Sequence, residues 1–167
     1  MSQKRVTAAI ALGSNLGDRA KYLRGALTRL ERTPGVVVLR RSTWHETEPV
    51  GGPPGQGSFL NGAALVETTL DAAALLAVLQ AIELKAGRER SVPDAARTLD
   101  LDLLMYGEMV MKKPGLEVPH PRMGERAFVL VPLAEIAPLW RHPENRRHID
   151  DLIADLPEGQ KIERLET

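Results

Sequence analysis

The amino-acid sequence predicts an α+β fold in which helices pack on one antiparallel sheet, and three observations support this prediction. Apolar residues alternate with the period of a β-strand over residues 6–12, 59–68 and 97–105, and residues 36–44 are rich in β-branched side chains that favour a strand. Two intervening segments carry apolar residues at helical spacing. The resulting order is βαββαβ, which is typical of a ferredoxin-like sandwich.

The first strand and the first helix are marked by their ends. The strand stops at Gly13-Ser14-Asn15, and Asp18 follows as a suitable N-cap for a helix. Pro34-Gly35 ends that helix. Its apolar stripe consists of Tyr22, Leu23, Ala26, Leu27 and Leu30. Such a stripe can cover one face of a sheet.

The middle of the chain repeats this arrangement. Strands are predicted over residues 36–44 and 59–68, with a loop rich in glycine and proline between them. Asp71 is the expected N-cap of the second helix, and Gly87 is its expected end. The apolar stripe of this helix consists of Leu75, Leu76, Leu79, Ile82 and Ala86.

The last third is predicted to add smaller elements. After the strand 97–105, a turn at Gly107-Glu108 leads to a short partner strand, residues 109–111. The later elements are an extended stretch over 118–122 and helices over 126–136 and 149–156. No repeat or change of composition divides the chain, so we expect a single domain over residues 1–167.

The composition limits the functional classes. Basic and acidic residues number 22 each, so no overall charge attracts nucleic acid or an anionic membrane. The chain has no cysteine, which excludes disulfides and thiolate metal sites and fits a reducing compartment. The longest uncharged helical stretch, residues 72–82, is too short to cross a bilayer. We expect a cytoplasmic monomer without nucleic-acid or membrane partners.

Two aspartates, Asp100 and Asp102, interrupt the most apolar strand. The apolar residues that alternate with them are Leu99, Leu101, Leu103 and Met105. The two carboxylates therefore share one face about 6.6 Å apart along the strand, close enough to hold a divalent cation. Three arginines come shortly before them: Arg88, Arg90 and Arg97. Carboxylates that hold Mg²⁺ beside arginines that bind phosphate are what phosphoryl transfer requires.

Short motifs also occur in a characteristic order along residues 6–139. They are A-L-G-S-N-L-G-D, T-E-P-V-G, F-L-N-G-A, I-E-L-K-A-G-R-E-R, R-T-L-D-L-D-L-L, V-P-H-P-R and R-A-F-V-L-V-P-L. In these motifs the chain resembles the 6-hydroxymethyl-7,8-dihydropterin pyrophosphokinases of folate biosynthesis. The resemblance implies a ferredoxin-like fold and Mg²⁺-dependent transfer of diphosphate from ATP to the hydroxymethyl group of a reduced pterin, with AMP as the second product.

The resemblance also implies roles for individual residues. Asp100 and Asp102 would hold two Mg²⁺ ions, and Arg88 and Arg97 would stabilise the phosphates during catalysis. The residues implied around ATP are Glu83, Arg90, Arg97, Leu103, His120 and Arg126. The residues implied around the pterin are Thr47, the Val50 backbone, Phe59, Asn61 and Phe128. The residue chemistry agrees, because a flat heteroaromatic ring favours aromatic faces and an amide that both donates and accepts.

Simpler interpretations of these residues exist. An Asp-x-Asp pair also occurs on solvated strand faces, and His120 between two prolines also suits an exposed loop. Glutamates such as Glu83 are usually solvated, and buried phenylalanines are usually plain core. Arg88 and Arg90 also suit the dipole at a helix C-terminus.

The chain departs from the family pattern at Ala95-Ala96, at Gly115 and in the loop after Arg88, which lacks the tryptophan that some members carry. Ala95-Ala96 stands where many members have Gly-Pro, and Gly115 stands where some members have a phosphate-binding arginine.

Other functional classes share the predicted fold. An RNA-binding module would need strand aromatics and a basic sheet face, but aromatic residues make up only 4% of the chain. A regulatory small-molecule-binding domain would not need the paired aspartates. A palm-type nucleotidyl transferase is the best-matched enzyme alternative.

Overall fold

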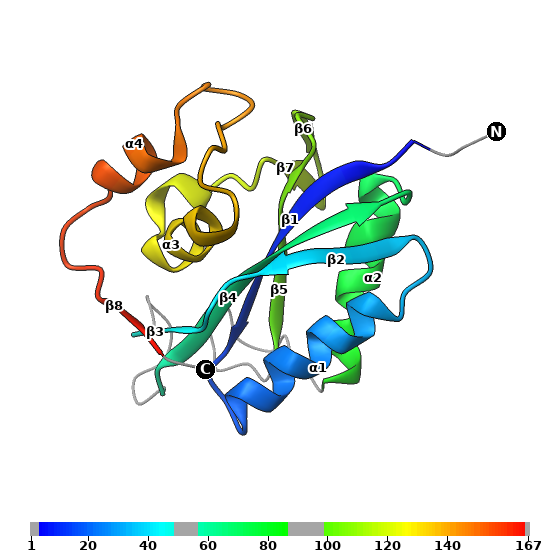
Figure 1. The fold of residues 1–167 in the computed structure, drawn as a ribbon, viewed down its shortest axis with the longest axis horizontal. Coiled ribbons are helices and arrows are strands. Elements are labelled where there is room, and N and C mark those ends of the chain that lie inside the picture. The colour runs from blue at the N-terminus through cyan, green and yellow to red at the C-terminus, as the bar shows by residue number, and fades with distance from the viewer. Residues whose placement is uncertain (1–3, 49–56, 87–98, 166–167) are drawn as a thin grey trace.

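The computed structural model describes residues 4–48, 57–86 and 99–165. Figure 1 shows the arrangement of its elements. In chain order they are β1 (Val6–Ser14), α1 (Arg19–Glu31), β2 (Val36–Arg41), β3 (His45–Thr47), β4 (Phe59–Thr68), α2 (Ala72–Lys85), β5 (Asp100–Tyr106), β6 (Met111–Lys113), β7 (Leu116–Val118), the 3-10 helix η1 (Met123–Glu125), α3 (Ala127–Ile136), α4 (Ile149–Ala154) and β8 (Ile162–Arg164).

The main sheet confirms the predicted fold class. Its strand order is β5-β1-β4-β3-β8, and β2 pairs with β4 further along the same edge as β3. Every pair in this sheet is antiparallel. Without the short strands β3 and β8 the order is β5-β1-β4-β2, which is the order of the predicted ferredoxin-like sandwich.

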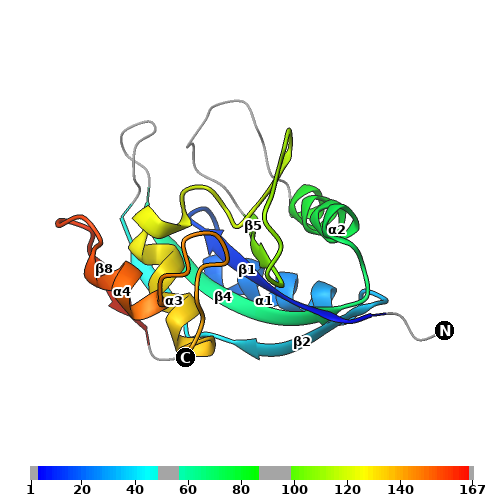
Figure 2. The ribbon, with the colours of Figure 1, turned by 90° about the horizontal axis from the view of Figure 1, so that it is seen from above.

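Helices cover both faces of this sheet and form two separate cores. Along β1, Ala8, Ile10 and Leu12 face the core shared with α1 and α2. Ala9 and Ala11 face the core shared with α3 and α4. In both views α3 and α4 lie together and well apart from α2 (Figure 1 and Figure 2). We call these the α1–α2 face and the α3 face of the sheet.

Both predicted N-caps are confirmed. The Asp18 carboxylate accepts a hydrogen bond of 3.2 Å from the Lys21 N–H at the start of α1. The Asp71 carboxylate accepts one of 2.8 Å from the Ala74 N–H at the start of α2. Each cap satisfies a backbone donor that the first helical turn leaves without an intrahelical partner.

Two loop segments differ from the prediction. The second strand ends at Arg41 instead of residue 44, and the chain forms the short strand β3 inside the predicted loop 45–58. The expected strand over residues 109–111 is wrong as a partner of the aspartate strand, because β6 pairs with β7 in a separate hairpin. Gly115 lies in the turn of this hairpin at a φ of 80°, a conformation that favours glycine.

The aspartate strand contains an irregularity that the sequence pattern did not reveal. Ala9 pairs with Met105 and Ile10 pairs with Leu103, so Leu104 is an extra residue on β5. This bulge sends both Leu104 and Met105 into the core beneath α3. The prediction that Met105 faces the same way as Leu101 is therefore wrong, because the bulge interrupts the alternation.

The C-terminal segment adds β8 to the outer edge of β3. Ile162 pairs with Thr47, and Arg164 pairs with His45. This strand was not predicted, because three residues carry too little periodicity to be recognised. In the part of the chain that the structure describes, no helix is long and apolar enough to cross a membrane.

Candidate active site

The candidate site lies on the α3 face of the sheet, on one row of paired residues across four strands. Gly13 in β1 pairs with Asp100 on one side and with Asn61 on the other. Asn61 in turn pairs with His45 in β3. Directly paired residues of antiparallel strands point to the same face. The row therefore brings the first predicted metal-binding aspartate and the predicted pterin-binding amide onto one surface.

The second aspartate lies one row further along the same face. Asp102 pairs with Ala11, which belongs to the core beneath α3. The prediction that Asp100 and Asp102 share a face is therefore confirmed, because the bulge in β5 begins only after them. Both side chains are half-buried. The two carboxylates therefore lie on the same face of the sheet, each partly exposed to solvent.

Gly13 leaves space in the centre of the row. A Cβ atom at this position would lie 3.0 Å from Asn61 Oδ1 and 3.6 Å from Phe59 Cδ1. The first distance is shorter than ordinary van der Waals contact, so a side chain here would press on the asparagine. The Asn61 and Phe59 side chains therefore lean over the backbone of the central strand.

Glu83 supports the aspartate strand from α2. Its side chain is buried, and Oε2 accepts a hydrogen bond of 2.8 Å from the Leu101 N–H, between the two aspartates. The alternative that Glu83 is a solvated helix residue is therefore wrong.

The predicted ATP residue Leu103 is also buried, with its side chain in the core of the α1–α2 face. Any contact of Leu103 with a ligand on the α3 face would therefore involve its main chain.

His120 and Arg126 lie near the aspartates. The His120 N–H donates to the Leu104 carbonyl at 2.8 Å, which ties this segment to β5. Burial lowers the pKa of His120, the positive charge of Arg126 lowers it further, and the negative charge of Asp100 partly opposes both. Half-burial of His120 argues against a freely exposed loop residue. Arg126 also lies over the Phe128 ring, with its Cζ atom 5.4 Å from the ring centroid.

The predicted pterin residues that the structure describes lie on β3, β4 and α3. Asn61 Nδ2 donates a hydrogen bond of 2.6 Å to Thr47 Oγ1, and Thr47 pairs with Phe59. A small pocket of about 110 Å³ has both Thr47 and Phe128 among its walls. The pocket residues are Thr47, Glu48, Ala127, Phe128, Gly159, Gln160 and Lys161. Stacking of Phe59 and Phe128 on opposite faces of one ring stays a prediction.

A polar cluster next to this region was not predicted. Glu135 of α3 accepts hydrogen bonds from the Thr43 N–H at 2.7 Å and the Thr43 hydroxyl at 2.9 Å, and its Oε2 lies 3.1 Å from His45 Nε2. Partial burial raises the pKa of Glu135, but the hydrogen bonds from Thr43 and His45 outweigh it, so the pKa lies below its usual range. The only local sign of this cluster in the sequence is the two-residue spacing of His45 and Thr47, which places both side chains on one face of a strand.

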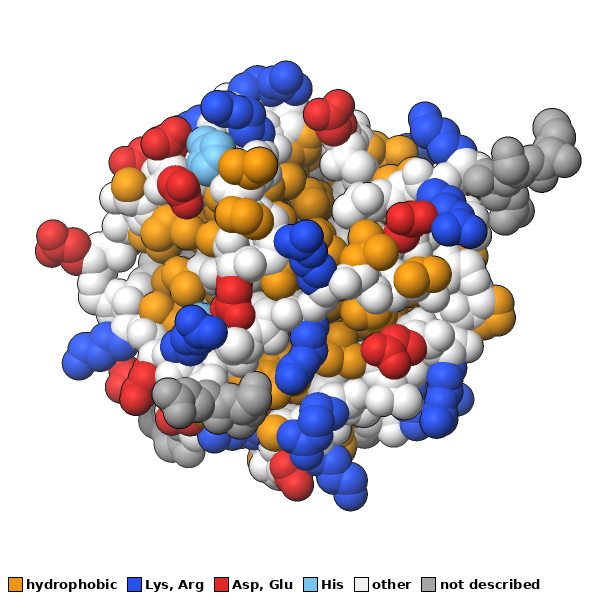
Figure 3. Space-filling view, viewed as in Figure 1, with side chains coloured by type: hydrophobic (Ala, Val, Ile, Leu, Met, Phe, Trp, Pro, Cys, Tyr) orange, Lys and Arg blue, Asp and Glu red, His pale blue; other side chains and the backbone are white. Residues whose placement is uncertain are grey.

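Several predicted site residues lie outside the described residues. They are Val50, Arg88, Arg90 and Arg97, together with the departure from the family pattern at Ala95-Ala96. The described part of the candidate site consists of Asp100, Asp102 and residues on β3, β4 and α3. On the face shown in Figure 3, acidic and basic side chains are interspersed around hydrophobic surface.

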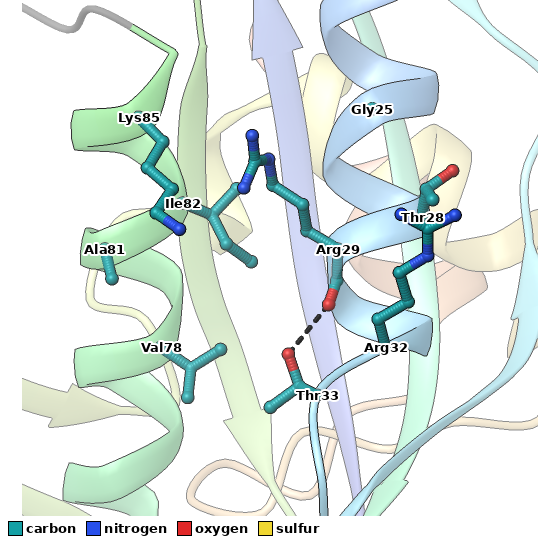
Figure 4. Close-up of a pocket in the computed structure, with 9 residues that line it drawn as sticks. All are labelled: Gly25, Thr28, Arg29, Arg32, Thr33, Val78, Ala81, Ile82 and Lys85. Carbon is teal, nitrogen blue, oxygen red and sulfur yellow. Dashed lines mark hydrogen bonds between the residues drawn. The ribbon is translucent and has the colours of Figure 1, made fainter.

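A larger groove of about 600 Å³ lies between α1 and α2, away from the α3 face. Figure 4 shows its lining, with the Arg29 side chain reaching toward Ile82 and Lys85 of α2. Its lining residues are Gly25, Thr28, Arg29, Arg32, Thr33, Val78, Ala81, Ile82 and Lys85. Of the predicted site residues that the structure describes, none lines this groove, so the described part of the candidate site lies elsewhere.

Known proteins resemble this chain over most of its length. A family model described as 7,8-dihydro-6-hydroxymethylpterin-pyrophosphokinase matches residues 9–138. The 2-amino-4-hydroxy-6-hydroxymethyldihydropteridine pyrophosphokinase of Pseudomonas aeruginosa is 45% identical over 157 residues, which are 93% of this chain and 94% of the relative. The protein of the same name from Bacillus subtilis is 48% identical over 129 residues, 77% of each chain.

Solved structures share the fold. A crystal structure of a triple mutant of Plasmodium falciparum HPPK-DHPS with SDX-DHP superposes with a TM-score of 0.71 at 16% sequence identity. The superposition covers 91% of this chain but only 44% of that one. The chain therefore spans less than half the length of this solved structure, and the similarity shows the fold.

Proposed function

The chain belongs to the 7,8-dihydro-6-hydroxymethylpterin-pyrophosphokinase family, and from this premise we propose how it transfers diphosphate from ATP to 6-hydroxymethyl-7,8-dihydropterin. The observation that carries the proposal is the row Asp100, Gly13 and Asn61. It joins an acidic position suited to a metal–ATP complex to an amide position suited to a pterin ring, on one face of one sheet.

The aspartates fit a magnesium site. Mg²⁺ prefers oxygen ligands and is usually held by one or two carboxylates together with phosphate oxygens and water. Asp100 and Asp102 supply two half-buried carboxylates on one strand face. When bound there, Mg²⁺ would neutralise phosphate charge during the transfer. We propose two ions, because ATP brings three phosphates to the site.

The pterin would occupy the space over Gly13 and Asn61. The Asn61 amide can both donate and accept hydrogen bonds, which matches the edge of a pterin ring. Phe59 and Phe128 would contact the ring faces, and Thr47 would hold Asn61 in place through the hydrogen bond of 2.6 Å. Val50 would contribute its backbone to the same edge.

The reaction then follows from the juxtaposition of the two substrates. The hydroxymethyl oxygen of the pterin attacks the β-phosphorus of ATP, and the bond from that phosphorus to the oxygen it shares with the α-phosphate breaks. AMP leaves with this oxygen, and the hydroxyl proton passes to solvent. Arg126, His120 and Glu83 would act around ATP, with Arg88, Arg90 and Arg97 on its phosphates.

One incubation tests the proposal. The protein is mixed with ATP, the reduced pterin and MgCl₂, and the nucleotide products are separated by ion-exchange chromatography. We expect AMP and pterin diphosphate in equal amounts, and no reaction when EDTA removes the metal. Release of inorganic pyrophosphate would instead indicate a nucleotidyl transferase. We propose that the protein acts as a monomer, because the row Asp100, Gly13 and Asn61 joins the two substrate positions within one sheet of one chain.

A further inference from the structure

Helix α3 begins without a cap from its own sequence. Arg126 precedes the helix, and its side chain makes no capping hydrogen bond. The first backbone N–H groups of a helix need partners from elsewhere. Here the partner comes from far along the chain, because Gln160 Oε1 accepts a hydrogen bond of 2.8 Å from the Ala127 N–H.

The same side-chain amide makes a second bond on the other side of Arg126. Gln160 Nε2 donates to the Glu125 carbonyl at 2.8 Å. The amide therefore holds the backbone on both sides of Arg126, whose guanidinium lies over the Phe128 ring. Only a side chain with one donor and one acceptor in this spacing can make both bonds.

Gln160 is itself anchored to the strand that carries Thr47. It lies two residues before Ile162, which pairs with Thr47 where β8 joins β3. The Leu165 N–H then donates to the Trp44 carbonyl at 2.8 Å. A displacement of Gln160 would therefore have to overcome the β3–β8 pairing. Through this residue, the start of α3 is tied to β3.

Gln160 also forms part of the wall of the 110 Å³ pocket that includes Thr47 and Phe128. The family model ends at residue 138, so this part of the chain lies beyond the match. We propose that Gln160 is a positioning residue of the pterin site, which sets the distance between Phe128 on α3 and Thr47 on β3. This assignment rests on the proposed function.

Two substitutions at Gln160 separate its hydrogen bonds from its bulk. Gln160→Met keeps the length of the side chain without either hydrogen bond, and Gln160→Ala also removes part of the pocket wall. Gln80→Met, at an exposed position of α2, is the matched control. For each protein we would measure AMP formation, the KM for the reduced pterin, the KM for ATP and the midpoint of thermal unfolding.

Loss of two hydrogen bonds predicts a rise of about tenfold in the KM for the pterin in Gln160→Met. The KM for ATP should change less than the KM for the pterin, because the long Arg126 side chain can adjust to a small shift of its backbone. The unfolding midpoint should fall by about 2–4 °C, because the first N–H of α3 loses its partner. Gln160→Ala should be at least as impaired, and Gln80→Met should match the wild type.

Other results would overturn the assignment. An unchanged KM for the pterin in Gln160→Met excludes positioning by the amide. Equal rises in both KM values indicate a general structural role instead. If the wild type forms no AMP, the proposed function fails and the assignment fails with it, whereas an active wild type with unaffected variants overturns the assignment alone.

Discussion

Glu83 and Leu101 form a buried hydrogen bond of 2.8 Å between a carboxylate of α2 and the backbone N–H that lies between the two aspartates. Removal of the carboxylate would leave that N–H buried without this partner. We predict that Glu83→Ala lowers the free energy of unfolding by about 1–3 kcal/mol. AMP formation should also fall, because β5 loses a contact beside Asp100 and Asp102.

Chemical denaturation and the AMP assay check this prediction. Glu31→Ala, at an exposed glutamate at the end of α1, is the control and should change neither quantity. If Glu83→Ala unfolds at the wild-type denaturant concentration, the hydrogen bond does not support the strand.

Asp100→Asn and Asp102→Asn should each reduce turnover by about a hundredfold or more, because each removes a charge that would help to bind Mg²⁺. The fold should be retained, and stability in EDTA should rise slightly, since one of two repelling carboxylates is neutralised. Asp150→Asn in the first turn of α4 is the control. Wild-type AMP formation by either variant would contradict the metal assignment.

Asn61→Ala should weaken binding of the pterin far more than binding of ATP. The loss leaves polar groups of the bound ring without a partner, at a cost of about 1–3 kcal/mol. Titration calorimetry with the pterin and with a non-hydrolysable ATP analogue measures both affinities. Asn145→Ala, at an exposed position near α4, serves as the control. Equal losses for the two ligands would show that Asn61 is not specific to the pterin.

Two neighbouring glycines on opposite faces of the sheet should respond differently to alanine. A Cβ at Gly62 would lie 2.4 Å from Trp44 in the core, so Gly62→Ala should destabilise the fold by about 1–3 kcal/mol. A Cβ at Gly13 would lie close to Asn61 Oδ1 alone, at 3.0 Å, with ordinary contacts to Phe59 at 3.6 Å and to the Leu60 carbonyl at 4.0 Å. Gly13→Ala should therefore raise the KM for the pterin with little change in stability.

Activity assays and thermal unfolding of both variants test this difference. Gly25→Ala is a useful third variant, because a Cβ there meets no atom within 4 Å. That helical substitution should stabilise the protein by up to about 1 kcal/mol. Normal binding of the pterin by Gly13→Ala would show that the pterin does not lie over Gly13 and Asn61.

The Glu135 cluster should make stability depend on pH in the acidic range. The folded protein holds the pKa of Glu135 below its ordinary value of 4.5, so the stabilisation is present above that pH. It is lost as the pH falls from 4.5 through the lowered pKa, because protonation weakens the bonds to Thr43 and His45. The difference in unfolding free energy between wild type and Glu135→Gln should therefore be largest at neutral pH. A difference that does not change down to acid pH would contradict this.

Much of the fold follows from local patterns in the sequence. The alternation in β1 and β4, the helical stripes and the caps at Asp18 and Asp71 are each specified within a few residues. The shared face of Asp100 and Asp102 follows from the period of a strand in the same way. These features were predictable because no distant contact decides them.

The features that were missed depend on distant contacts. Strand β3 is set by pairing with β4, and β8 by pairing with β3 in turn. The bulge at Leu104 depends on the register between β5 and β1. Glu135 and Gln160 contact backbone groups far away in the sequence, and no local pattern marks such partners.

The row through Gly13 makes the geometry of the candidate site a property of the sheet. Asp100 and Asn61 are separated by two strand-to-strand steps, or about 10 Å between backbones, and hydrogen bonds in the sheet hold this spacing. If the substrates bind as proposed, this fixed spacing sets the distance between the phosphates of ATP near Asp100 and the pterin ring near Asn61. A pterin whose alcohol sits one carbon further from the ring would overshoot the phosphorus, and its bound oxygen would be poorly aligned for attack.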